Sequence, residues 1–123
     1  MNTETAFNII LPLPEQLFRD LSVQPDLLVK LLPEECRLAL NNYLIQGIKN
    51  KDGGPSIVDL HLRNWEYQED THAGTFRFYF RVHRNYTCSA LEAAQLDYLD
   101  FSFTDLREEF VATATYFYWD LDN

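Results

Sequence analysis

The hydrophobic pattern of this chain changes its period at residues 53–55, Gly-Gly-Pro. Before this segment, over residues 36–48, apolar side chains recur at the spacing of one helix face. After it, over residues 75–88, apolar and polar side chains alternate, which is typical of a half-buried strand. Helices followed by consecutive strands predict an α+β domain. The composition, with 46% hydrophobic and 24% charged residues, excludes an intrinsically disordered chain, a collagen-like repeat and a membrane-spanning bundle.

Three proline–acid pairs mark the expected helix starts: Pro14-Glu15, Pro25-Asp26 and Pro33-Glu34. Proline is tolerated at the first helical position, and acidic side chains in the first turn complement the helix dipole. The pairs predict three helices, over about 14–22, 25–32 and 33–50. In the third helix the apolar stripe comprises Cys36, Leu40, Tyr43, Leu44, Gly47 and Ile48.

Four strands are expected after residue 55, over about 57–69, 75–88, 96–104 and 109–121. Their short connections favour an antiparallel meander, with the helices covering one face. The segment Phe7–Leu11 is either a fifth strand at the edge or an extended lead-in. With 123 residues, the chain has the length of a single domain, so we expect one α+β domain over 1–123 with a helical part over 12–50 and a sheet over 56–121.

The negative charge is concentrated near the C-terminus. The chain has 19 acidic and 10 basic residues, a formal net charge of −9, and residues 89–123 hold eight of the acids with one base. This excess opposes binding to nucleic acids and anionic membranes and favours a basic protein partner. We therefore expect a non-enzymatic interaction module, of the inhibitor, immunity or accessory type, that docks through its C-terminal strands. The partner-binding residues predicted on this basis are Asp97, Asp100, Asp105, Glu108, Glu109 and Trp119.

A second surface is predicted on the polar side of the first hairpin. If the turn at 70–74 pairs odd-numbered residues with odd-numbered residues, the cationic and aromatic side chains of the strand over 57–69 lie beside those of the strand over 75–88. The interpretations left open are a solvated sheet face and a partner-binding face. The residues of this sheet-face patch are His61, Arg63, Trp65, Arg77, Tyr79, Arg81 and His83.

The last predicted strand is apolar on both faces, so a second molecule or a curled sheet must cover its outer side. A homodimer is one such arrangement. The alternative function is a cone-shaped domain, cystatin-like or NTF2-like in outline, that binds a small ligand or supports weak catalysis. Its cavity would be lined by Trp65, Tyr116, Tyr118 and Trp119.

No motif for catalysis, phosphate binding or metal binding is found. His61 and His83 with Asp59 lack a further ligand at metal-binding spacing, so we assign no catalytic residue, no cofactor and no metal. Cys36 and Cys88 are isolated, which favours reduced thiols and a cytoplasmic location. No apolar stretch approaches the ~18 residues of a membrane helix.

Overall fold

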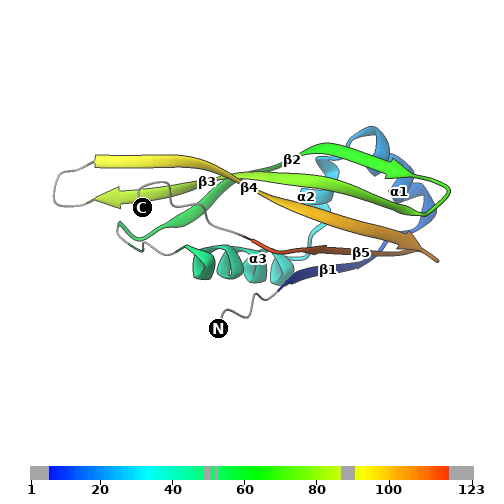
Figure 1. Ribbon diagram of the computed structural model, residues 1–123, viewed down its shortest axis with the longest axis horizontal. Helices are drawn as coiled ribbons and strands as arrows, with labels where there is room; N and C mark the ends of the chain where they lie inside the picture. Colours follow the sequence, from blue (N-terminus) through cyan, green and yellow to red (C-terminus); the bar gives the residue numbers. More distant parts are fainter. Residues whose placement is uncertain (1–5, 49–50, 52, 87–90, 117–123) are drawn as a thin grey trace.

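The computed structural model describes residues 6–48, 51, 53–86 and 91–116 (Figure 1). It is a mixed α+β structure with three helices and an antiparallel sheet, as predicted. The sheet has five strands, because the segment Phe7–Leu11, which was expected to be either a strand or an extended lead-in, forms a strand. The elements are β1 (Phe7–Pro12), α1 (Glu15–Val23), α2 (Leu27–Leu31), α3 (Glu34–Gly47), β2 (Ser56–Gln68), β3 (Ala73–Tyr86), β4 (Leu91–Leu106) and β5 (Glu109–Ala114).

The strands follow the order β1-β5-β4-β3-β2, and every pair is antiparallel. Strands β2 to β5 form the expected meander, and β1 adds to β5 with Ile9 opposite Ala112. Beyond the end of β1, the Leu13 N–H donates to the Glu108 carbonyl at 2.8 Å. Backbone hydrogen bonds therefore join the first and last elements of the fold. Figure 1 shows these two strands, β1 and β5, side by side.

The helices start close to the prolines, as expected. α1 and α3 begin directly after Pro14 and Pro33. α2 has only five residues, because Pro25 and Asp26 form a turn before it, so the prediction of a helix over 25–32 is too long. α3 ends at Gly47, short of the predicted residue 50.

The core lies between the helices and one face of the sheet, and aromatic rings fill much of it. Phe76 and Phe101 stack with ring centroids 4.8 Å apart, and Phe103 lies 5.0 Å from Phe110. Phe18 of α1 contributes an edge-on contact at 4.8 Å to Tyr67 of β2. The inward-facing side chains of the sheet belong to all five strands: Ile9, Leu11, Leu62, Phe76, Phe78, Phe80, Val82, Leu99, Phe101, Phe103, Phe110, Ala112 and Ala114.

The opposite face of the sheet, here called the helix-free face, carries the alternate residues. None of the described helices covers this face. β5 shows the division: Phe110, Ala112 and Ala114 are buried, whereas Val111 and Thr113 face outward. Phe117 to Trp119, which made the predicted last strand apolar on both faces, lie outside the described residues.

Alternation in the sequence predicts that Val58, Leu60 and Leu62 share one face of the strand expected over 57–69, and two β-bulges in β2 overturn this prediction. The pairing with β3 shifts between Val58 and His61 and again between Arg63 and Glu66. Asp59 and Asn64, inside these shifts, have φ angles of 58° and 61°. Each bulge adds one residue and so exchanges the faces beyond it. Val58 consequently lies on the helix-free face, opposite Arg81, and not beside Leu62.

Candidate functional site

The predicted acidic residues do not form one surface. Asp97 points to the core side, where it accepts a hydrogen bond of 2.6 Å from the Tyr116 hydroxyl. Asp100 lies on the helix-free face, opposite Arg77. Asp105, Glu108 and Glu109 lie at the end of the sheet, around the β4–β5 turn. Trp119 lies outside the described residues.

A cleft of about 820 Å³ opens at that end of the sheet. The β2–β3 turn, the β4–β5 turn and the first turns of α1 converge there. We call it the end cleft. It is lined by Leu13, Glu15, Phe18, Arg19, Ser22, Tyr67, Glu69, His72, Asp105, Leu106, Arg107 and Glu108.

Asp105 is the unusual group of the end cleft. Its Oδ1 atom is buried and has no hydrogen-bond partner among the described residues. Burial raises the pKa of the Asp105 carboxyl, and the Glu108 carboxylate raises it further, while His72 opposes the shift. A buried acceptor without a donor costs free energy, so this oxygen favours any donor that enters the cleft.

The remaining charges of the cleft are predominantly acidic. The lining contains four carboxylates and two guanidinium groups. One arginine is already engaged, since Arg19 binds Glu15 at 2.7 Å. Glu108 Oε2 accepts the Glu15 N–H at 3.3 Å and so caps the start of α1. Burial, and then the carboxylates of Asp105 and Glu69, raises the pKa of Tyr67.

Backbone conformation at the cleft is unusual. His72, Arg107 and Glu108 have φ angles of 55°, 54° and 62°. Arg107 and Glu108 are the two central residues of the β4–β5 hairpin, where a type I′ turn requires positive φ and normally uses Asn-Gly. Left-handed backbone costs a non-glycine residue about 1–2 kcal/mol. Such strain at a cleft is a recognised mark of functional positions. The sequence predicts a turn within Thr104–Glu108, and the structure places it at Arg107 and Glu108; the type I′ conformation was not predicted, because Arg-Glu is not a sequence typical of such a turn.

On the helix-free face, the structure brings together six residues of the predicted sheet-face patch. Arg77 binds Asp100 through two hydrogen bonds, Nε–Oδ1 at 2.6 Å and Nη2–Oδ2 at 3.0 Å. Its guanidinium lies 3.9 Å from the Tyr98 ring centroid and 5.7 Å from that of Tyr79. His61 stacks on Tyr79 at 5.7 Å. The hydrogen bonds to Asp100 and Tyr79 raise the pKa of Arg77, so this group stays charged.

The other cations of the patch have looser partners. Arg81 lies 3.5 Å from Asp59, and Arg63 lies 3.6 Å from Asp26. His83 lies opposite Ser56. These arginines are half exposed, so their ion pairs are weak compared with the Arg77–Asp100 pair.

Trp65 is not part of this patch. The bulge at Asn64 turns it to the core side, where it stacks on Phe103 at 4.7 Å and on Phe76 at 6.0 Å. The expected side-by-side arrangement with Arg77 is therefore wrong. Tyr116, also proposed for a ligand cavity, packs edge-on against Phe80 at 6.0 Å.

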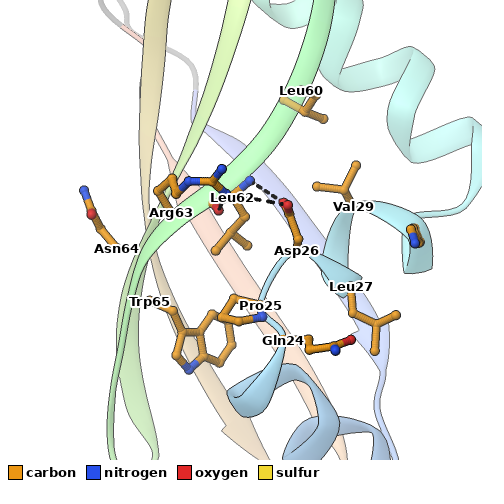
Figure 2. A pocket seen from close by; sticks show the side chains of 11 residues that line it. Gln24, Pro25, Asp26, Leu27, Val29, Leu60, Leu62, Arg63, Asn64 and Trp65 are labelled. Atoms are coloured by element: carbon orange, nitrogen blue, oxygen red, sulfur yellow. Dashed lines mark hydrogen bonds and ion pairs between the residues drawn. The ribbon is translucent and has the colours of Figure 1, made fainter.

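A second crevice, of about 570 Å³, separates α2 from the edge strand β2 (Figure 2). Asp26 reaches across it, and its Oδ1 accepts the Leu62 N–H at 2.7 Å. The carboxylate thus occupies the position of a neighbouring strand's carbonyl. An edge strand blocked in this way resists pairing with another chain, so we read the crevice as edge protection. Sequence reasoning saw Asp26 only as a helix-start residue.

Within the described part of the chain, no three His, Cys, Asp or Glu side chains are grouped so that they could hold a metal ion. The described helices are all too short or too polar to cross a membrane. Cys36 is half-buried, and burial raises the pKa of its thiol; Cys88 lies outside the described residues. No protein-family model matches the chain, and no curated protein or solved structure matches it either.

Proposed function

We propose that this protein is a non-enzymatic interaction module that receives a basic side chain of a partner protein in the end cleft. The observation that carries the proposal is the buried Oδ1 of Asp105, which lacks a hydrogen-bond donor among the described residues. An ammonium or guanidinium group supplies such donors. Charge-assisted hydrogen bonds of this kind are about twice as strong as neutral ones.

The shape and chemistry of the cleft support the same occupant. Phe18 and Leu13 are buried apolar residues of its lining, against which the methylene stem of lysine or arginine can pack. Glu69 and Glu108 add negative charge at its rim. The net charge of −9 attracts a basic partner over a longer range and raises its association rate.

The set of binding residues is accordingly revised from the sequence-based prediction. Asp105 and Glu108 remain in it, and Glu69 joins them, whereas Glu109 is not among the residues that line the end cleft. Asp97 and Asp100 are instead assigned to the fold, because each already binds a side chain of this chain. The inhibitor, immunity or accessory role and the cytoplasmic location remain part of the proposal, on the basis of acidity and isolated cysteines.

A small organic cation is the second candidate occupant. The end cleft has a volume in the range of small-molecule sites, about 300–1,000 Å³. The enclosed cavity of a cone-shaped domain finds less support, since stacked rings occupy the space between α1 and the sheet.

The proposal is tested with a fluorescent lysine peptide as the probe, measured by anisotropy at a series of salt concentrations. The double variant Glu69→Gln/Glu108→Gln removes two cleft charges while keeping an acceptor oxygen at each position. Glu34→Gln/Glu35→Gln removes two exposed charges from the start of α3 and is the matched control. We expect the cleft variant to lose about tenfold in affinity, equivalent to ~1.4 kcal/mol, and to show a flatter salt dependence.

Equal losses in the two double variants would mean that the peptide responds only to net charge, and the proposed site would be rejected. Butylamine added as a competitor separates the two occupants. Displacement of the peptide at low millimolar butylamine favours the small-cation alternative, whereas a peptide that resists butylamine favours a protein partner.

A further inference from the structure

We propose that the helix-free face is a self-association surface, on which a second copy of this chain packs face to face. This surface is separate from the end cleft and does not depend on the function proposed there. It is defined by the outward residues of the central strands, above all Arg77, Tyr79, Tyr98 and Asp100.

Exposed apolar side chains gather on this face. Leu96 on β4 is 58% exposed and points away from the core. Ile10 on β1 is 62% exposed and lies on the same face, but it is in register with Thr104, eight residues along β4 from Leu96. Tyr98 and Val58 add further exposed apolar surface at 40% and 38%. An exposed apolar patch bordered by polar residues is characteristic of a protein interface. Of the other exposed apolar residues, Val23 and Leu38 lie on helices, and Leu106 lines the end cleft.

The size of the face is sufficient for a dimer. The strands β1 to β5 have 6, 13, 14, 16 and 6 residues, and at about 3.3 Å per residue and 4.8 Å per strand they give the sheet a flat area of roughly 870 Å². The accessible surface is larger than this, because the side chains stand out from the sheet. Stable interfaces bury about 800 Å² on each partner, so the face falls into that class.

The arrangement of residues across β3 and β4 points to a second copy as the occupant. In the register of these strands, Arg77 lies opposite Asp100 and Tyr79 opposite Tyr98. A two-fold axis that lies in the interface and runs between β3 and β4 places each β3 over β4 of the other copy. Arg77 of one copy then faces Asp100 of the other, and Tyr79 faces Tyr98. Each cross-strand pair of β3 and β4 on one copy thus faces the same pair, in reversed order, on the other copy.

The other rows agree with this arrangement. Arg81 lies opposite Leu96, so the arginine stem of one copy covers the exposed leucine of the other. Thr75 lies opposite Ser102, which brings two hydroxyl groups together. Arg77 is already held by Asp100 and by the two tyrosine rings, so little side-chain entropy is lost when the second copy binds. Tyrosine and arginine residues fixed in this way are typical centres of binding energy.

Sedimentation velocity over low to high micromolar protein tests the proposal. We expect the wild-type protein to sediment as a dimer at the higher concentrations. Leu96→Glu places a charge in the interface and should weaken the dimer by about tenfold or more. Leu38→Glu on α3 is the matched control, since Leu38 is also 58% exposed, and should leave the dimer unchanged.

A charge exchange tests the axis itself. Arg77→Asp and Asp100→Arg each place like charges opposite one another, within the chain and across the dimer, so each variant alone should be monomeric. Mixed in equal amounts they should form a heterodimer, because the new aspartate of one faces the new arginine of the other. Circular dichroism confirms that each single variant is folded. If either does not fold, Leu96→Glu against Leu38→Glu decides alone.

Three results would overturn the inference. One is a wild-type protein that stays monomeric at every concentration. Another is a dimer that Leu96→Glu does not weaken, since the contact would then lie elsewhere, for example at the β1 edge. The third is a pair of folded charge variants that do not associate when mixed.

Discussion

Asp105 links the fold of the end cleft to the pH dependence of stability. Its raised pKa means that the folded protein holds this proton more readily than the unfolded chain. The free energy of unfolding therefore falls as pH rises from the unperturbed value of 3.8 through the raised value. Asp105→Asn does not titrate, so relative to wild type it should gain stability across this window. Urea unfolding of both proteins from pH 3 to pH 7 measures the difference, and a pH-independent difference would contradict the assignment.

Gly74 shows a packing constraint that is invisible in the sequence, where it reads only as a turn residue. A Cβ atom here would lie 2.2 Å from the Glu66 carbonyl oxygen and 2.6 Å from the Phe103 ring. The backbone oxygen cannot move without breaking the β2–β3 pairing. Gly74→Ala should therefore cost about 2–4 kcal/mol, measured by urea unfolding.

Gly54→Ala is the control for this substitution. Gly54 has a φ angle of 58°, but no neighbouring atom of the described residues lies within 4 Å of a Cβ placed there. Its replacement should cost only the left-handed backbone energy, about 1 kcal/mol. Similar losses at the two positions would show that the close contact at Gly74 is not limiting.

At the scale of elements, the bulge at Asn64 sets which residues of β2 enter the core. Asn64→Gly keeps the required φ angle and should change stability by less than about 0.5 kcal/mol, since both residues tolerate positive φ. Asn64→Val should cost about 1–2 kcal/mol, because a β-branched residue is strained there. Near-ultraviolet circular dichroism should also change for Asn64→Val, since Trp65 follows the bulge into the core. Gln68→Val, at an exposed and regular position of the same strand, should have little effect.

The elements themselves were largely predictable, and their irregularities were not. Proline–acid pairs located α1 and α3, and alternation located β3, because these signals are local. The bulges in β2 depend on pairing with β3 and on two polar residues that accept positive φ. The pairing of β1 with β5 is a contact between the two ends of the chain, which no local pattern contains. The bulge at Asn64 is the reason that the predicted position of Trp65 in the sheet-face patch is wrong.

At the scale of the whole molecule, total charge was a poor guide to where the charges meet. The sequence correctly showed that the later strands are acidic, yet it could not show that strand alternation sends Asp97 and Asp100 to opposite faces. Among the described residues, the end cleft brings together Asp105 and Glu108 of the β4–β5 hairpin, Glu69 of the β2–β3 turn and Glu15 of α1. The end cleft and the helix-free face are distinct surfaces, so occupancy of one is compatible with occupancy of the other.

Binding of a basic side chain in the end cleft can be observed residue by residue in a ¹⁵N–¹H correlation spectrum of the labelled protein, recorded during titration with the lysine peptide. We expect shift changes centred on the backbone amides of residues 15–19, 67–72 and 105–108, with the outward residues of β3 unaffected. Changes centred on Arg77 to Arg81, or spread evenly over all acidic residues, would contradict binding in the end cleft.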